Sequence, residues 1–137
     1  MKSMIIISAF FLLLSSCDLG DELDKAIIDV SGKVSHDGNA VTGAIVLLVE
    51  DVSISSGLSL ANGSISDNSG HYTILNVDPG SYYVLAVDDR DGNLQLDATT
   101  DRIGFYGVVP PTDLEANQIS VSDMDVENIN ITSLYSF

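Results

Sequence analysis

The sequence predicts an all-β domain with the architecture of a β-sandwich, for three reasons. Short apolar or alternating segments recur along the chain, with glycine, proline, asparagine and aspartate turn signals between them. Valine, isoleucine and glycine are abundant, and leucine-rich helical stretches are missing after the first 16 residues. The remaining chain of about 120 residues has the usual length of one domain. Strands at this spacing are typical of a sandwich.

The strands are expected in the following order. Residues 28–35 alternate apolar and polar side chains, which predicts a half-buried strand, and Asp37-Gly38 is a hairpin signal. The continuous apolar run 44–49 fits a strand that is covered on both faces. A loop is expected over 52–62. Later strand segments are expected at 71–77, 81–87, 103–109, 118–121 and 126–132, and one face of the second of these is expected to carry Tyr82, Val84 and Ala86.

Four short motifs in this part of the chain resemble the carboxypeptidase regulatory-like domains. They are Val30-Ser-Gly-Lys-Val34, Val41-Thr-Gly-Ala-Ile-Val46, Asp67-Asn-Ser-Gly-His-Tyr72 and Val77-Asp-Pro-Gly-Ser-Tyr82. The resemblance covers residues 27–90, about half of the chain without its leader. It implies a seven-stranded, transthyretin-like Greek-key sandwich. Such modules are usually non-catalytic companions in exported proteins, so the resemblance implies an architecture more than an activity.

The N-terminus has the features of a secretory leader. Lys2 supplies a positive charge, and residues 5–14 form a largely apolar run. That run is shorter than the roughly 20 residues needed to span a bilayer, but it has the length of a signal-peptide core. Leu14-Ser15-Ser16-Cys17 resembles the lipobox of bacterial lipoproteins, which implies cleavage before Cys17 and attachment of lipid to its thiol.

This resemblance fits the composition, because Cys17 is the only cysteine and cannot form an internal disulfide. The predicted organisation is a signal peptide over 1–16, a lipidated cysteine and polar tether over 17–25, and a β-sandwich over 26–137. We therefore expect a lipid-anchored protein of the bacterial cell envelope. A plain cleaved signal peptide is the alternative. Asp18 resembles an inner-membrane retention signal in one sorting system only, which leaves the choice of membrane open.

The charge balance excludes one class of partner. The chain has 5 Lys and Arg residues against 20 Asp and Glu residues, a net charge of -15, and removing residues 1–16 deletes Lys2 and no acid. Such a surface repels nucleic acid, so no nucleic-acid partner is expected. The expected partners are the membrane, through the lipid anchor, and an envelope protein or glycan.

An aspartate-rich segment between two predicted strands carries the one candidate for metal chemistry. Its spacing resembles a calcium-binding loop, in which alternating oxygen ligands face one hard cation. The candidate ligands, at positions 1, 3, 5, 7 and 9 and just beyond position 12, are Asp89, Asp91, Asn93, the backbone carbonyl of Gln95, Asp97 and Asp101. Leu94 or Leu96 could anchor the loop to the core. Calcium is the only cofactor that the sequence suggests.

The segment also departs from the EF-hand pattern. Leu94 stands where a glycine is expected, Thr100 replaces the closing glutamate, and no helices flank the loop. Arg90 and Arg102 could each neutralise a carboxylate. The alternative is therefore a solvated connection whose aspartates only form turns.

No set of nucleophile and base is apparent in the sequence, so an enzyme is not expected. His36 and His71 lie beside predicted turns and are expected at the surface. Phe105 and Tyr106 follow the acidic loop and are the aromatic residues best placed to contact a ligand, although core packing is the alternative. The sequence thus predicts a lipid-anchored, non-catalytic envelope module with a structural or binding role. A calcium-stabilised ligand-binding module and an envelope hydrolase are the alternatives.

Overall fold

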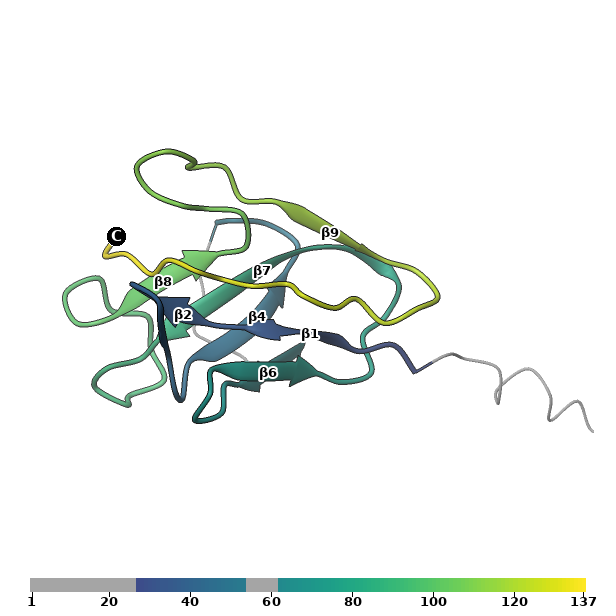
Figure 1. Ribbon diagram of the computed structural model, residues 1–137, viewed down its shortest axis with the longest axis horizontal. Coiled ribbons are helices and arrows are strands. Elements are labelled where there is room, and N and C mark those ends of the chain that lie inside the picture. The colour runs from purple at the N-terminus through teal and green to yellow at the C-terminus, as the bar shows by residue number, and fades with distance from the viewer. Residues whose placement is uncertain (1–26, 54–61) are drawn as a thin grey trace, which may run out of the picture.

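The computed structural model describes residues 27–53 and 62–137, and the regular elements in these residues are β-strands (Figure 1). The predicted signal peptide, Cys17, the tether and most of the loop predicted over 52–62 lie outside the described residues. Among the residues that are described, no helix has the length and apolar character needed to cross a membrane.

The described residues form nine antiparallel strand segments in three sheets. The largest sheet has the order β5-β4-β7-β8, and β9 also pairs with β7. The strands β1 and β6 form a second sheet, and β2 and β3 form a hairpin. The segments are β1 (Val30–Lys33), β2 (Ser35–His36), β3 (Asn39–Ala40), β4 (Ile45–Val49), β5 (Gly63–Ile65), β6 (His71–Ile74), β7 (Gly80–Asp88), β8 (Arg102–Phe105) and β9 (Gln118–Val121).

The long strand β7 organises the larger sheet. One edge of β7 pairs along residues 83–87 with β4. The other edge is divided, because its first half pairs with β9 and its last four residues pair with β8. The side chains of β7 alternate between two apolar layers, so that both faces of the sheet are covered. This confirms the prediction that residues 44–49, which pair with β7, form a strand buried on both faces.

The main hydrophobic core lies between the larger sheet and the sheet formed by β1 and β6. Its buried side chains come from β1, β6, one face of β4, β7 and β9, and the C-terminal residues. Tyr82, Val84 and Ala86 face this core, as predicted. A second apolar cluster covers the opposite face of the larger sheet and contains Ile45, Leu47, Leu85, Val87, Ile103, Phe105 and Val108. The arrangement is that of a β-sandwich.

The C-terminal residues cross from one sheet to the other (Figure 1). Residues 126–135, which we call the crossing segment, first run parallel to β1 through isolated bridges from Val126 to Val30 and from Ile131 to Val34. They then reach β8, where Tyr135 pairs with Ile103. Regular pairing over 126–132 was predicted and is wrong. Between the two bridges, the crossing segment advances five residues, from Val126 to Ile131. The segment that contains β1 advances only four, from Val30 to Val34, so one residue of the crossing segment bulges out of the ladder.

The bulge is located at Asn128, which adopts a left-handed φ of 62°. A second departure from the predicted strands occurs at Asn76, whose φ of 55° ends β6 at Ile74 rather than at residue 77. The predicted hairpin at Asp37-Gly38 is confirmed, because both residues have positive φ and β2 pairs with β3 around them. The described strands do not confirm the expected count of seven or the Greek-key order.

Candidate metal centre in the acidic loop

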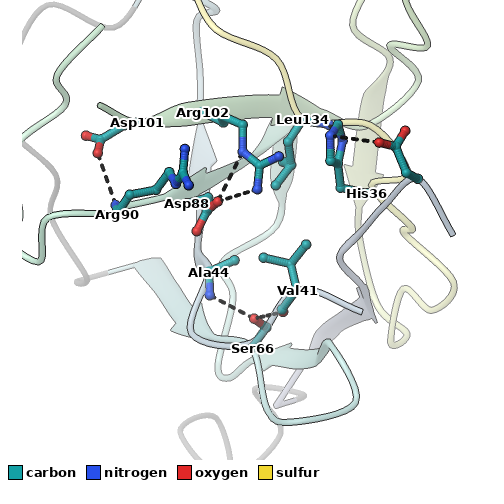
Figure 2. A network of polar contacts seen from close by, with 10 residues as sticks. His36, Val41, Ala44, Ser66, Asp88, Arg90, Asp101, Arg102 and Leu134 are labelled. Atoms are coloured by element: carbon teal, nitrogen blue, oxygen red, sulfur yellow. Dashed lines mark hydrogen bonds and ion pairs between the residues drawn. The ribbon is translucent and has the colours of Figure 1, made fainter. Parts of the chain in front are cut away.

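The acidic loop, residues 89–101, joins β7 to β8, and the residues on either side of it pair with each other. Asp88 and Arg102 are paired in the ladder between these strands, and their side chains form an ion pair of 2.7 Å between Arg102 Nη2 and Asp88 Oδ2 (Figure 2). Arg102 therefore neutralises a carboxylate just outside the predicted ligand set. Arg90 instead donates its backbone N–H to Asp101 Oδ1 at 3.1 Å.

Asp101 is the carboxylate that holds the two halves of the acidic loop together. Its side chain is only 1% exposed. Oδ1 accepts from the Arg90 N–H and, at 3.2 Å, from the Thr100 hydroxyl, whereas Oδ2 accepts from the Asp97 N–H at 2.9 Å. A buried carboxylate needs such partners because burial removes it from water. Asp101 thus has a structural role that its position in the sequence did not indicate.

Asp89 organises the first turn of the loop. Its Oδ1 accepts from the Gly92 N–H at 2.9 Å, and its Oδ2 accepts from the Leu94 N–H at 2.9 Å. Gly92 and Leu94 both have left-handed backbones, with φ of 71° and 58°. Leu94 occupies the position at which the calcium-loop pattern expects glycine, and it takes the turn conformation nevertheless. The bonds to Asp89 offset the strain of that conformation.

The structure brings together three of the six predicted ligands. Each of Asp89, Asp91 and Asp101 offers a carboxylate oxygen, and these atoms lie within 4.8 Å of one another, so the group could hold a metal ion. Asn93 lies beside them and donates from Nδ2 to Asp91 Oδ2 at 2.9 Å. Carboxylate and amide oxygens suit a hard divalent cation.

The other predicted ligands are engaged in turns. Asp97 Oδ1 accepts from both the N–H and the hydroxyl of Thr99, at 2.9 and 2.7 Å. Asn93 Oδ1 accepts from the Gln95 N–H at 2.7 Å. These contacts match the turn-forming alternative, because short polar side chains bond to a backbone N–H two residues ahead. The loop is therefore shaped by its own side chains around a group of three carboxylates.

The pKa values of three carboxylates of the acidic loop, those of Asp89, Asp91 and Asp97, do not all shift in the same direction. The N–H of Leu94 is the main cause that lowers the pKa of Asp89. Partial desolvation is the main cause that raises the pKa of Asp91, and the negative charges of Asp89 and Asp101 add to it. The Thr99 hydroxyl and N–H lower the pKa of Asp97. The closeness of Asp89 and Asp101 to Asp91, rather than these shifts, is what favours a cation at this place.

We expect these carboxylates to titrate in a defined order as the pH falls. Asp91 should take its proton above the ordinary aspartate value, and Asp89 and Asp97 should take theirs below it. The turn held by Asp89 is then intact at and above the ordinary value and is lost as the pH falls through the lowered pKa. NMR from pH 7 to 2 measures both events. The chemical shifts of the side-chain carboxyl carbons report protonation, and the amide shift of Leu94 reports its bond to Asp89. Loss of the Leu94 bond before Asp91 is protonated would contradict this order.

Most of the apolar residues in and just after the acidic loop pack against one of the two apolar clusters. Leu96 packs against the second cluster, whereas Leu94 is 58% exposed, so Leu96 is the anchor of the loop. Phe105 is buried in the same cluster, and Tyr106 packs half-buried against the main core. Phe105 and Tyr106 thus face opposite sides of the sheet and do not form one platform. Phe105 still lines an open groove of about 430 Å³ on the outer face, together with Tyr83, Leu114 and Tyr135.

The two histidines differ in their surroundings. His71 is exposed, as predicted, and its Nδ1 lies 3.9 Å from Asp67 Oδ1. The side chain of His36 is only 27% exposed, and its Nδ1 accepts from the Leu134 N–H at 3.1 Å. The sequence contains no local signal for this contact, because its two residues are 98 positions apart.

No family model matches the chain, and no curated protein matches it. One similar solved structure is an N-terminal interface mutant of a type II cohesin–X-dockerin complex from Acetivibrio cellulolyticus. The TM-score is 0.46 at 16% identity, over 80% of this chain and 58% of that one. Another is a DUF3823 family protein from Parabacteroides merdae ATCC 43184, with a TM-score of 0.40 at 14% identity, over 80% of this chain and 48% of that one. The chain thus spans about half the length of these structures.

Proposed function

We propose that this chain is a lipid-anchored, non-catalytic module of the bacterial envelope that presents its acidic loop to a partner. The observation that carries the proposal is the position of the loop. The start of the described chain, just before β1, lies at one end of the sandwich, and the acidic loop between β7 and β8 lies at the opposite end (Figure 1). An anchor on Cys17 would therefore favour an orientation with the end before β1 toward the membrane and the loop away from it.

Two backbone contacts tie the start of the described chain to the rest of the sandwich. The N–H of Asp29 donates to Asp125 Oδ1 at 2.9 Å, and the N–H of Asn76 donates to Asp29 Oδ1 at 3.0 Å. The start of β1 is thereby joined to the loops that follow β6 and β9. These bonds fix the place at which the described chain enters the sandwich. The proposed partner at the far end is an envelope protein or glycan.

The contacts of the two histidines support a binding or structural role over a hydrolase that uses histidine as its base. In the described part of the chain, His36 contacts Leu134 and Asp37, and His71 contacts Asp67. Neither contact sets a histidine against a hydroxyl or thiol nucleophile, as acyl transfer requires. For the sandwich itself we propose the seven-stranded, transthyretin-like class that its four motifs resemble. Turnover of envelope or glycan substrates by the purified chain would instead support the hydrolase.

The lipid anchor is tested by replacing Cys17 with serine. The wild-type protein is expected to incorporate labelled palmitate and to sediment with membranes. Cys17→Ser should lose the label and leave the membrane fraction, because the acyl chains supply the attachment. Asp18→Asn is the matched control and should keep both properties. Membrane sedimentation of wild type without palmitate label would support a different kind of attachment.

A second candidate function is calcium-dependent ordering of the acidic loop, and the group formed by Asp89, Asp91 and Asp101 favours it. Desolvation is the main cause that raises the pKa of Asp91, and a divalent cation there would relieve the repulsion from Asp89 and Asp101 that adds to it. It would add contacts between metal and oxygen to a loop whose turns are held by the loop's own hydrogen bonds. The cation would then order the end of the sandwich that meets the partner and take no part in chemistry.

Thermal melting with calcium or with EDTA tests this second candidate. A ligand at 100 times its Kd stabilises the folded state by about 2.7 kcal/mol, which is roughly 10 °C for a domain of this size. Wild type should show a rise of that order in calcium, and Asp91→Asn should not. Asp123→Asn removes an exposed charge at the opposite end and should behave as wild type. Equal melting temperatures in calcium and in EDTA would contradict the calcium-dependent function and would not bear on the proposal of a lipid-anchored module.

A further inference from the structure

His36 occupies a position that the sequence did not suggest, between the β2–β3 turn and the crossing segment (Figure 2). Its Nδ1 accepts the Leu134 N–H at 3.1 Å. An imidazole nitrogen accepts only while it carries no proton, so the neutral ring here has its proton on Nε2. Nε2 lies 3.4 Å from Asp37 Oδ2.

The bond from Leu134 lies at the point where the crossing segment passes between the two sheets. On one side, the Ile131 N–H donates to Lys33 O at 2.9 Å. On the other side, Tyr135 exchanges two backbone bonds with Ile103, of 2.7 and 2.9 Å. Leu134 lies between these attachments and is 3% exposed. His36 therefore supplies the acceptor for a buried N–H at the crossing itself.

We propose that His36 is a pH-sensitive latch, which holds the crossing segment at Leu134 while its ring is neutral and releases it when the ring is protonated. Both nitrogens of a protonated imidazole are donors. The ring would then set an N–H against the N–H of Leu134, and a buried donor without an acceptor is unfavourable. The released ring can turn into the open groove of about 380 Å³ that it lines with Asp37, Asp88 and Arg102.

The charged groups that face His36 act in opposite directions. Asp37, on the same turn, attracts the protonated ring, although its side chain is 85% exposed and its charge is screened by water. Arg102 on β8 lines the same groove and repels the protonated ring. The negative charge of Asp88 on β7 is already engaged by Arg102 at 2.7 Å. Geometry thus makes the Leu134 bond the contact that distinguishes the two protonation states.

Release at Leu134 affects the opposite face of the larger sheet. Tyr135 follows Leu134 and lines the outer groove with Phe105 and Tyr83. Its partner Ile103 is two residues beyond Asp101. The latch therefore links the protonation of His36 to the outer groove and to the base of the acidic loop. The inference does not depend on a lipid anchor or on a bound cation.

Amide hydrogen exchange of Leu134 tests the latch in the purified full chain. Exchange is measured by NMR from pH 8 to 5, corrected for intrinsic rates, and the His36 ring is titrated in the same samples. The protection of Leu134 is expected to fall roughly two- to tenfold as the ring is protonated, since one hydrogen bond is lost. Protection that stays constant across the His36 titration would overturn the proposal.

Two variants separate a titrating latch from a structural contact. In His36→Asn the amide oxygen takes the place of Nδ1 and does not titrate, so Leu134 should stay protected down to pH 5. His71→Asn removes the exposed histidine and should keep the wild-type pH dependence. A pH dependence that survives in His36→Asn, or one that disappears in His71→Asn, would assign the change to another group and overturn the latch.

Discussion

Replacing Gly32 with alanine is expected to destabilise the fold by about 3 kcal/mol, the upper range for overpacking. A Cβ at this position would overlap the Ile129 carbonyl and lie 2.9 Å from the Tyr72 hydroxyl. The hydroxyl cannot retreat easily, because it is buried and donates to the same carbonyl at 2.6 Å. The crossing segment would have to move away from β1, which would open the main core.

Denaturation of Gly32→Ala in urea, followed by fluorescence or circular dichroism, measures this loss. Ser31→Ala is the matched control, because it changes the adjacent residue of the same strand and adds no atom. The control is expected to remain within about 0.5 kcal/mol of wild type. A loss below 1 kcal/mol for Gly32→Ala would show that the crossing segment is not held against β1.

Replacing Asp101 with alanine is expected to cost a comparable amount, about 3 kcal/mol. The substitution removes the buried carboxylate that accepts from the N–H groups of Arg90 and Asp97, and a hydrogen bond to a charged group contributes about 1.5–3 kcal/mol. The acidic loop should then separate into two independent halves. The amide protection of Arg90 and Asp97 should fall together, whereas that of β4 should follow global stability.

Asp91→Ala is the control for this second variant, because Asp91 is an exposed carboxylate in the same loop. It should change stability by less than 1 kcal/mol in the absence of a cation. Equal losses in Asp101→Ala and Asp91→Ala would mean that general charge repulsion, rather than the buried bonds of Asp101, decides the stability of the loop.

The elements that the sequence predicts well are those whose pattern is local. Residues 44–49 and 81–87 carry apolar side chains in a strand pattern, and both segments form strands whose faces are as expected. The Asp37-Gly38 turn depends only on which residues tolerate a positive φ. The acidic loop is likewise local, since the alternation of Asp89 and Asp91 already sets both carboxylates on one side of a tight turn.

The features that the sequence does not predict depend on contacts between distant segments. The bulge at Asn128 follows from the fit of the crossing segment onto Gly32, almost 100 residues earlier in the chain. His36 is half-buried and accepts a hydrogen bond from Leu134, which lies 98 residues later in the chain. Asp101 was predicted as a cation ligand, and its burial was not predicted, because it depends on the pairing of β8 with the end of β7. Periodicity contains no information on such pairings.

The crossing segment also sets the order in which the chain can fold. Its partners on β1 lie almost 100 residues earlier, as the bonds from Ser31 to Val126 and from Lys33 to Asn130 show. Pairing across so long a stretch folds slowly, because the loop must close before the contact repays the lost entropy. The main core therefore cannot be completed until Leu134, the last of its buried residues, has been synthesised. For a chain that we propose to be exported, such late completion of the core would favour passage through a membrane before folding.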